Sequence, residues 1–509
     1  MKILVLTGRL AEHIVERAVD AATEKDIDVT IEKDIDVFVK VVDVDVASFI
    51  TERHLDDIDT SGYDMVLVPG LVSGNFSAVE KRCGVPVRRG PKHAVDLGFV
   101  LSFADTVEFS HSIPACELLS SKNRKKAFET VVRLEADSTY AFTVRDTRIG
   151  GNSRMKVMAE VVSADSFSVA ELGHIIHLFV HEGADIIDLG MSLDAQVEDA
   201  TRAVKTARRV CDVPVSIDTL DPDLLAASLD EGANLCLSLN SENMDAVAPL
   251  AVDVPCVILP DLRHDASARA NIRSLEKNIA AAKEYKIKHI IADPVLDAIN
   301  HGFSKSVIRF MEFHRRNLDV PLFFGVGNVS ELVDIDSTGV NGLLAGIGSE
   351  IGASILFTPE FSDKNKGSIR ELKIASEMMV LSKYRESAPK DLGIDLLRLK
   401  EKRRRPFDIP PPIFIPAKAL TGWELDPAGG VKISITEGNV QNGKILDGMI
   451  IASHRNGVVM GRNASEVLDT LIERGFVSTL HHAGYLGREL ARAELALNLG
   501  RSFVQDDGF

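Results

Sequence analysis

The sequence predicts an α/β protein in which a central TIM (β/α)8 barrel is flanked by an N-terminal α/β layer domain and a C-terminal α+β domain. Three observations carry this prediction. Short apolar runs recur between residues 156 and 358, and the segments between them have the 3.6-residue period of amphipathic helices. The chain of 509 residues has the length of about three domains. The pattern of apolar and turn residues also changes on both sides of the central region.

The N-terminal part begins with two β-branched runs that precede glycine-bearing turns. KILVL (2–6) comes before TGRL, and DMVLV (64–68) comes before PGLVSGN; helical stretches such as AEHIVERAVDAA follow. Strands that alternate with helices in this way favour a small α/β layer. We expect this domain, together with a polar connector, over residues 1–150.

The central region contains eight apolar runs, each of strand length. They are KVMAEVV (156–162), DIIDLG (185–190), VPVSID (213–218), NLCLSLN (234–240), VPCVILP (254–260), HIIADP (289–294), PLFFGV (321–326) and ASILFT (353–358). Parallel strands that are buried on both faces read as continuous apolar runs of this kind. Eight strand–helix units predict a TIM barrel over residues 151–390. A doubly wound open sheet is the alternative, because order along the chain does not show closure.

The last part of the chain starts with a basic, proline-rich stretch, LKEKRRRPFDIPPP (399–412), which we expect to be a linker. Strand-like KISIT and MIIAS follow, and the chain ends with a long helical pattern, YLGRELARAELALNL. We therefore place the linker and a C-terminal α+β domain over residues 391–509.

Composition excludes several classes of partner. The 58 Lys and Arg against 75 Asp and Glu give a net charge of −17, which repels a phosphate backbone, so we expect no nucleic acid partner. No apolar run approaches the roughly 18 to 20 residues that span a bilayer, and the start lacks the pattern of a signal peptide. The five cysteines form no C-x-x-C pair. We expect a cytoplasmic homo-oligomer that does not bind membranes.

Polar residues interrupt three of the apolar runs at their carboxyl ends, where the working residues of a barrel lie. Asp218 ends the third run, Asn240 and Ser241 end the fourth, and Asp293 ends the sixth. A carboxylate accepts two N–H bonds from an amidine-like edge, and an Asn side chain both donates and accepts. The set suits a flat heterocycle with adjacent ring N–H and amino groups. A helix-cap role for Asp218 and Asp293 and a turn role for Asn240 are the alternatives.

Four segments resemble the pterin-binding barrels of dihydropteroate synthase and its relatives: MAEVVSADSFS (158–168), EGADIIDLG (182–190), VPVSIDT (213–219) and HIIADP (289–294). The whole arrangement, including HHAGYLGRELARAELAL (481–497), resembles the archaeal dihydropteroate synthase-related proteins. The resemblance implies that Asp218, Asn240 and Asp293 hold the pyrimidine edge of a pterin.

The sequence departs from the dihydropteroate synthase pattern at the positions that serve pyrophosphate. The Ser-Thr-Arg-Pro segment is replaced by residues 190–194, Ser-Arg-Lys by 327–329, and Arg-x-His by 356–358. The strand-one asparagine, a magnesium ligand in that family, appears as Val161, so we predict no metal. Because the cations that would stabilise the leaving oxyanions are missing, we do not expect the ordinary condensation.

Other positions resemble the pterin methyltransferases, including the folate-binding part of cobalamin-dependent methionine synthase. The matching segments are Asn240-Ser241, the Asp-Pro-Val-Leu at 293–296 and the Gly-Val-Gly-Asn-Val-Ser at 325–330. This likeness implies that Ser241 and Gly325 belong to the pterin site. It also implies that Asn328, as the catalytic residue, hydrogen-bonds N5 of a methylated pterin, because an amine leaves poorly until its nitrogen is protonated or polarised. A structural role in a glycine-rich turn is the alternative for Asn328.

The resemblance implies a transferase that moves a one-carbon (methyl) or pterinylmethyl group in archaeal tetrahydromethanopterin or folate metabolism. The substrate or cofactor would be a reduced pterin of the tetrahydromethanopterin or tetrahydrofolate type. No corrinoid-binding Asp-x-His-x-x-Gly segment is present, so a corrinoid or other acceptor would come on a separate protein. The alternatives are dihydropteroate synthase-type condensation of a pterin pyrophosphate with an arylamine, a non-catalytic pterin carrier, and an unrelated barrel enzyme such as an aldolase. An aldolase is disfavoured because none of the eight runs ends in the lysine that a Schiff base needs.

Overall fold

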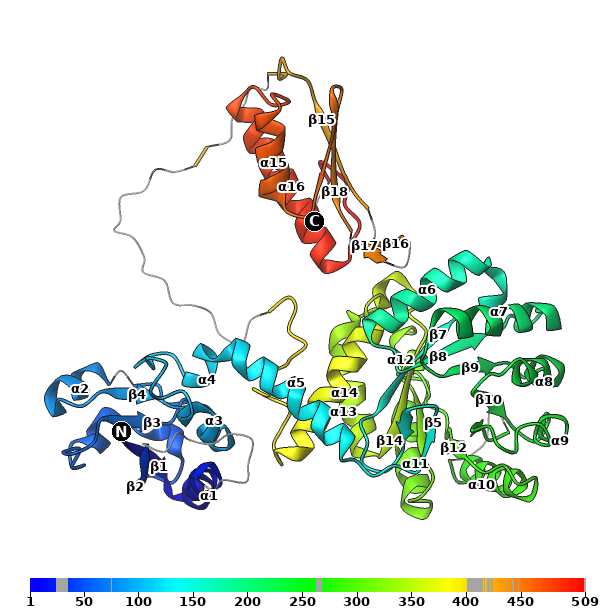
Figure 1. Ribbon diagram of the computed structural model, residues 1–509, viewed down its shortest axis with the longest axis horizontal. Helices are drawn as coiled ribbons and strands as arrows, with labels where there is room; N and C mark the ends of the chain where they lie inside the picture. The colour runs from blue at the N-terminus through cyan, green and yellow to red at the C-terminus, as the bar shows by residue number, and fades with distance from the viewer. Residues whose placement is uncertain are drawn as a thin grey trace. The chain divides into compact units, whose positions relative to one another are not determined.

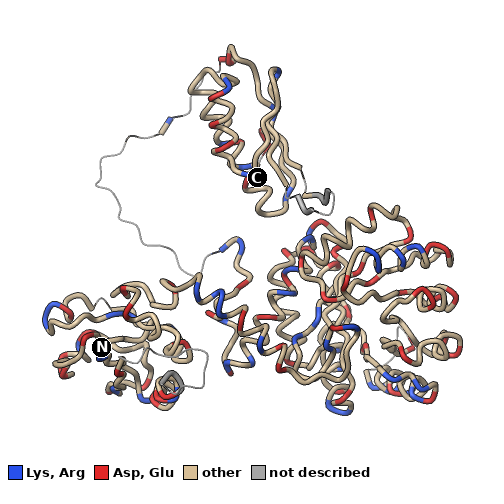
Figure 2. Tube along the Cα trace, in the orientation of Figure 1, with Lys and Arg blue, Asp and Glu red and all other residues tan. Residues whose placement is uncertain are grey.

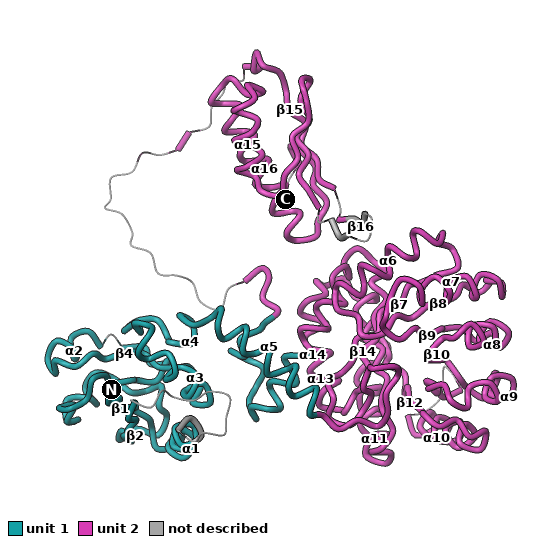
Figure 3. Tube along the Cα trace, viewed as in Figure 1, with its two compact units in different colours: residues 1–137, 377–395 teal, residues 138–376, 396–509 magenta. Residues whose placement is uncertain are grey.

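The computed structural model describes residues 1–23, 35–74, 76–261, 268–400, 424–436 and 448–507, with a few short stretches between 415 and 446. Residues 401–412 of the expected linker lie outside this description. The chain forms two compact units, residues 1–137 with 377–395, and residues 138–376 with 396–509 (Figure 3). Acidic and basic residues are interspersed along both units (Figure 2). Of the helices described, none is both long enough and apolar enough to cross a bilayer.

The first unit is built on a four-stranded parallel sheet in the order β2-β1-β3-β4 (Figure 1). Its strands are β1 (Lys2–Gly8), β2 (Asp36–Val42), β3 (Met65–Val68) and β4 (Val87–Arg89), and its helices are α1 (Glu12–Thr23), α2 (Ser77–Cys83), α3 (Leu97–Leu101), α4 (Ala115–Leu118) and α5 (Ser120–Ala136). Alternate residues of β1 enter different cores: Ile3 and Val5 pack on one face, and Leu4 and Leu6 on the other. Apolar side chains on both faces explain why these strands read as continuous apolar runs.

Residues 377–395 complete this first unit, although they follow the barrel in the sequence. Leu381 and Leu392 pack with Val131 of α5. Arg385 also forms an ion pair with Asp96, and both side chains are buried. A buried charge pair and an apolar contact therefore join the two segments of the unit.

The second unit contains a closed barrel in which eight neighbouring strands pair in parallel and the last pairs with the first. The strands are β7 (Lys156–Val161), β8 (Ile186–Gly190), β9 (Val215–Asp218), β10 (Leu235–Leu239), β11 (Cys256–Ile258), β12 (Ile290–Ala292), β13 (Leu322–Gly325) and β14 (Ala353–Thr358). The helices are α6 (Val169–Glu182), α7 (Val197–Val210), α8 (Pro222–Asp230), α9 (Met244–Val247), α10 (Ala268–Glu284), α11 (Phe303–Arg316), α12 (Gly327–Ser330), α13 (Ser337–Glu350) and the first part of α14 (Ser368–Tyr384), whose residues from 377 onward belong to the first unit. They connect the strands around the outside of the barrel (Figure 1). Closure confirms the TIM barrel and excludes the doubly wound alternative.

The register of the strands arranges the inward side chains in layers. Met158 lies opposite Ile186, and both belong to the apolar core of the barrel. Two residues further on, Glu160 lies opposite Asp188. Because side chains alternate along a strand, Glu160 and Asp188 also face inward, one layer nearer the carboxyl ends. The barrel is therefore apolar in its middle and acidic above it.

A short hairpin fills the amino end of the barrel. β5 (Phe142–Val144) and β6 (Thr147–Ile149) pair antiparallel. Phe142, Val144 and Ile149 join the same apolar core as the inward strand residues. The interior is thus packed with side chains at the end opposite the expected site.

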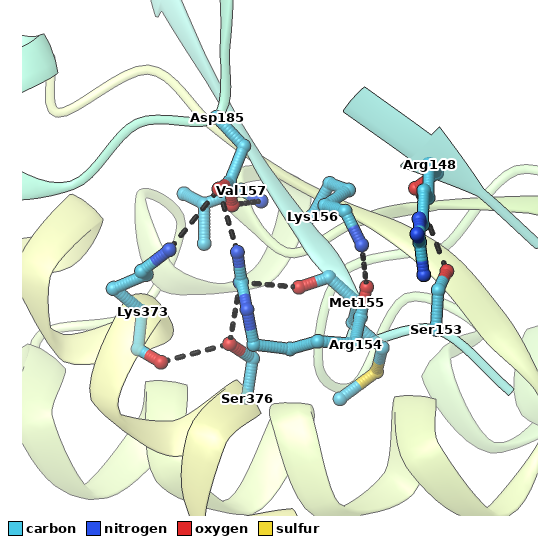
Figure 4. A network of polar contacts seen from close by, with 9 residues as sticks. All are labelled: Arg148, Ser153, Arg154, Met155, Lys156, Val157, Asp185, Lys373 and Ser376. Carbon is cyan, nitrogen blue, oxygen red and sulfur yellow. Dashed lines mark hydrogen bonds and ion pairs between the residues drawn. The ribbon is translucent and has the colours of Figure 1, made fainter. Parts of the chain in front are cut away.

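An ion network lies where β7 and β8 begin, beside α14 (Figure 4). Asp185 Oδ1 accepts hydrogen bonds from Arg154 at 2.6 Å and from Lys373 at 3.1 Å, and its Oδ2 accepts one from the Val157 amide at 2.9 Å. Arg154 also donates to Ser376 Oγ at 3.0 Å. Burial tends to raise the pKa of Asp185, but the charges of Arg154 and Lys373 and these hydrogen bonds hold it well below its usual range. The network connects the strands to the last barrel helix.

The C-terminal domain is an antiparallel sheet packed against two helices, as the α+β prediction requires. It consists of β15 (Val431–Ile435), β18 (Ile450–His454) and β19 (Gly457–Gly461), a hairpin of β16 (Asn439–Gln441) and β17 (Lys444–Leu446), and helices α15 (Ala464–Glu473) and α16 (Leu480–Leu499). Ile433, Ile450, Leu471 and Leu490 belong to its core. Val431 and Ile433 of β15 and Ile450 and Ala452 of β18 are buried apolar residues at alternate positions, which is typical of a sheet with one covered face.

Candidate functional site

Asp218 lies at the carboxyl end of β9, and it does not cap the helix that follows. The N-cap of α8 is Asp221, whose side chain accepts hydrogen bonds from the amides of Asp223 and Leu224. Asp218 Oδ1 instead accepts a hydrogen bond from Ser238 Oγ at 2.5 Å. Burial raises the pKa of Asp218, and the Ser238 hydrogen bond only partly opposes it. The helix-cap alternative is therefore excluded for Asp218.

Asp293 follows β12 and is 7% exposed. Its Oδ1 accepts a hydrogen bond from the Val295 amide at 2.7 Å, and the next helix begins only at Phe303, so Asp293 is a turn acceptor and not a helix cap. Burial raises its pKa to about 7, although the Val295 hydrogen bond and the charge of Arg309 favour the ionised form. Asp293 is therefore about half ionised near neutral pH.

Arg309 fixes the loop that carries Asp293. Its Nε donates to the Pro294 carbonyl at 2.6 Å, and its Nη2 donates to the Val295 carbonyl and to Asp297 Oδ2. Val295 has a positive φ of 68°, which a β-branched residue adopts only when its surroundings enforce it. The loop is thus held in one conformation by a buried arginine that the sequence analysis did not identify.

Asn240 and Ser241 follow β10 and have different environments. Asn240 is 6% exposed, and its Oδ1 accepts a hydrogen bond from the Glu242 amide at 2.8 Å, so the turn role expected as an alternative is present. Within the described ranges, its Nδ2 makes no hydrogen bond with the protein. Ser241 is exposed, and its amide donates to Asp261 Oδ1 at 3.2 Å. Asn240 can therefore stabilise the turn and still donate to a ligand.

Asn328 and Gly325 lie together after β13. Asn328 is exposed on the short helix α12, and its Nδ2 donates to the Leu296 carbonyl at 3.1 Å, which joins the loop after β13 to the loop after β12. Gly325 is buried, and a Cβ built there would lie 2.9 Å from Asn328 Nδ2. The absence of a side chain at Gly325 provides the space that the Asn328 amide occupies.

We predict that Gly325→Ala displaces the Asn328 side chain without unfolding the barrel. The backbone at residue 325 does not require glycine, because its φ is not positive, but the added methyl group needs a shift of several tenths of an ångström. The hydrogen bond to Leu296 should lengthen or break, at a cost of about 1 kcal/mol in the free energy of unfolding. A crystal structure of the variant and its urea midpoint would check this. An Asn328 amide that stays in place would contradict it.

Two acidic residues at this end of the barrel were not identified from the sequence. They are Glu160 on β7 and Asp188 on β8. One carboxylate oxygen of Glu160, one of Asp188 and one of Asp218 all lie within 4.8 Å of one another. Val161, where the resemblance placed the missing magnesium ligand, has the opposite strand parity to Glu160 and faces the helices. The sequence does contain a signal, because each of these two apolar runs holds one acidic residue. Glu160 and Asp188 lie two residues after the inward-facing Met158 and Ile186, and alternate residues of a strand share one face.

Burial raises the pKa of all three acidic groups, and neighbouring carboxylates add to the shifts of Glu160 and Asp188. Asp188 is fully buried, and its pKa lies well above the usual range because of burial first and then the charges of Asp218 and Glu160. Burial, Asp218 and Glu331 raise the pKa of Glu160 to about 7. In the part of the chain that the structure describes, no Lys, Arg or His side chain pairs with any of the three.

Three family models match separate parts of the chain, and one relative matches nearly its whole length. The family model described as pterin binding enzyme matches residues 162–346, within the barrel. A family of unknown function, DUF6513, matches residues 1–92, and the PterinBD-DUF4346 family matches residues 425–506. The uncharacterized protein MJ0107 of Methanocaldococcus jannaschii is 36% identical, over 99% of this chain and 98% of that protein.

Solved structures of dihydropteroate synthases are similar to just under half of this chain. The enzyme from Xanthomonas albilineans in complex with 7,8-dihydropteroate is 21% identical with a TM-score of 0.37, over 47% of this chain and 95% of that chain. The enzyme from Thermus thermophilus in complex with 6HMPPP is 20% identical with a TM-score of 0.36, over 44% of this chain and 93% of that chain. The enzyme from Yersinia pestis is 17% identical with a TM-score of 0.39, over 48% of this chain and 99% of that chain.

The closed barrel and the family match inside it define the class of this region: a TIM barrel of the pterin binding enzyme type. This confirms the resemblance found in the sequence. More narrowly, the chain belongs to the family of the M. jannaschii protein MJ0107, with which it shares its whole length.

Proposed function

We propose that the carboxyl end of the barrel binds a reduced pterin through Asp218, Asn240 and Asp293. A pterin presents adjacent N–H and amino groups along its pyrimidine edge, and a carboxylate can accept both hydrogen bonds. The observation that carries the proposal is that two carboxyl groups at strand ends, the half-buried Asp218 and the buried Asp293, are not used as helix caps. The Asn240 Nδ2 group adds a donor for the ring oxygen or a ring nitrogen.

We further propose that the protein transfers a one-carbon group, a methyl or pterinylmethyl group, with Asn328 beside N5 of the pterin. In methyl transfer the C–N5 bond breaks, its electron pair returns to N5, and a proton on N5 makes the departing group a neutral amine. Asn328 Nδ2 is held by the Leu296 carbonyl, which leaves the amide oxygen to accept a hydrogen bond from the protonated nitrogen. That interaction is stronger for the protonated form, so it favours the transition state over the ground state. The acceptor would be a thiol or a corrinoid on a separate protein.

The direct test is methyl loss from a methyltetrahydropterin, with a thiol or a corrinoid as the acceptor. Methyl loss that depends on the protein supports the transferase. Condensation of a pterin pyrophosphate with an arylamine, without methyl transfer, would replace it with a synthase. Pterin binding with neither reaction would make the protein a carrier.

We predict that Asn328→Ala lowers kcat/KM for methyl transfer by about 10- to 100-fold. The reason is that the variant loses a positioned hydrogen bond that is stronger in the transition state than in the ground state. Pterin affinity should change by less than about threefold, because the amide already bonds to Leu296 in the ground state. Leu332→Ala, at an exposed position nearby, is the matched control. An unchanged rate for Asn328→Ala would remove this residue from the mechanism.

A further inference from the structure

We propose that Glu160, Asp188 and Asp218 together bind one hard divalent cation, Mg²⁺ or Mn²⁺, in the layer beneath the pterin site. The cation site does not require a bound pterin. Two of the three, Glu160 and Asp188, have no part in the pterin proposal.

The barrel register places the three ligands on adjacent strands. Glu160 lies opposite Asp188, and Asp188 lies opposite Ser216, two residues before Asp218. One oxygen from each carboxylate lies within 4.8 Å of the others. A cation that contacts oxygens at about 2.0 to 2.6 Å requires them to be no more than about 4 to 5 Å apart. The observed spacing fits that limit without a change of the backbone.

An unsatisfied buried atom points to a ligand here. Asp188 is fully buried; its Oδ1 accepts a hydrogen bond from Ser216 Oγ, but its Oδ2 has no hydrogen-bond partner in the described chain. Buried carboxylate oxygens are almost always paired with a donor or a metal ion, because an isolated one is costly. A cation bonded to Asp188 Oδ2 would satisfy this atom.

Two further carboxylates of the barrel, Asp185 and Glu371, have the partners that this cluster lacks. Arg154 and Lys373 neutralise Asp185. Glu371 accepts hydrogen bonds from Ser337, Thr338 and Asn341. Arg309 donates to the loop after β12 and forms no ion pair with the cluster. The cluster thus gathers three carboxylates without a cationic side chain in the described residues.

The chemistry of the ligands selects the class of cation. All three are carboxylate oxygens, with no His or Cys in the group, and such donors suit Mg²⁺, Mn²⁺ or Ca²⁺ better than zinc or copper. Ser216 Oγ donates to Asp188 Oδ1 and Ser238 Oγ donates to Asp218 Oδ1, and these bonds orient the two carboxylates, as groups around a metal site commonly do. Gly190 provides space for the third ligand, because a Cβ there would lie 2.3 Å from Glu160 Oε1.

The test is Mn²⁺ binding to the full-length protein after treatment with a chelator, without pterin, measured by calorimetry and by electron paramagnetic resonance. We expect one Mn²⁺ per chain and a rise in the melting temperature. Asp188→Asn and Glu160→Gln should each weaken binding by at least about tenfold, because each removes one of only three protein ligands. Asp194→Asn, which changes an exposed acid in the loop after β8, should leave it unchanged.

Gly190→Ala is a second variant that keeps every charge and moves only the Glu160 carboxylate, and it should also weaken Mn²⁺ binding. No Mn²⁺ binding below about 1 mM, the weak end of protein sites for such cations, would overturn the proposal and show that protons neutralise the cluster. Binding that Asp188→Asn, Glu160→Gln and Gly190→Ala leave unchanged would also overturn it, since the ion would then lie elsewhere. Retained Mn²⁺ binding without pterin binding would contradict only the proposed function.

Discussion

Replacing Arg154 with Ala is expected to lower the free energy of unfolding of the barrel by about 3 kcal/mol. The Arg154 side chain is 6% exposed and that of Asp185 is 15% exposed, so the substitution leaves a buried carboxylate that has lost its nearest cation. Breaking a buried ion pair costs about 3 to 5 kcal/mol. The lower end applies because Lys373 remains 3.1 Å from Asp185.

The measurement is the urea midpoint and the melting temperature of the full chain, followed by circular dichroism. Arg370→Ala is the matched control, because Arg370 pairs with Glu182 at 3.3 Å through a side chain that is 46% exposed. An exposed pair is worth about 0 to 1 kcal/mol. Equal effects of the two variants would show that the Arg154 network does not stabilise the barrel.

The same network predicts a pH dependence. The pKa of Asp185 is lower in the folded protein than in the unfolded chain, so its contribution is fully present above the unfolded value of about 3.9 and is lost as the pH falls below it. The stability difference between wild type and Arg154→Ala should therefore be constant from about pH 5 to 8 and shrink below about pH 4. A difference that persists at low pH would contradict this assignment.

Asp293→Asn is expected to weaken pterin binding by about 1.5 to 3 kcal/mol, or roughly 10- to 100-fold. An Asn side chain can still accept the hydrogen bond from the Val295 amide, so the loop should keep its conformation. The substitution removes the charge and replaces one acceptor oxygen with an NH2 group. This NH2 group would face the N–H and amino groups of the pterin ring, which are also donors. Calorimetry with reduced and methylated pterins measures the change.

Asp218→Asn should have an effect of similar size, whereas Asp319→Asn, an exposed position, should have none. Unchanged affinity in both Asp293→Asn and Asp218→Asn would exclude this site for the pterin. Because the pKa of Asp293 is about 7 and the ionised form accepts the two hydrogen bonds, wild-type affinity should fall as the pH drops below about 7. The decline should approach tenfold per pH unit, and Asp293→Asn should lose this dependence.

The fold could be predicted because the strands of a parallel barrel are buried on both faces. All eight apolar runs became strands, from Lys156–Val161 to Ala353–Thr358. The number of runs favoured a closed barrel but did not exclude an open sheet, because pairing of the last strand with the first depends on tilt and register and not on composition. The inclusion of residues 377–395 in the first unit was equally hidden, since the packing of Leu381 and Leu392 against Val131 is a long-range contact.

The candidate site could be predicted only where a polar residue ends an apolar run. Asp218, Asn240 and Asp293 were identified in this way. Glu160 and Asp188 were not identified because each lies inside an apolar run. One acidic residue within an apolar strand does not by itself indicate a binding site. Their importance comes from the register that places them side by side, and register is a property of strand pairs and not of one strand.

The hairpin that packs Phe142, Val144 and Ile149 into the amino end of the barrel has a kinetic consequence. With that end filled, a reactant would have to reach the polar layer from the other end, where the loops after the strands lie. Two reactants that approach from the same end are expected to bind in order, the deeper one first, and their products to leave in the reverse order. Product-inhibition patterns would show such a compulsory order of addition.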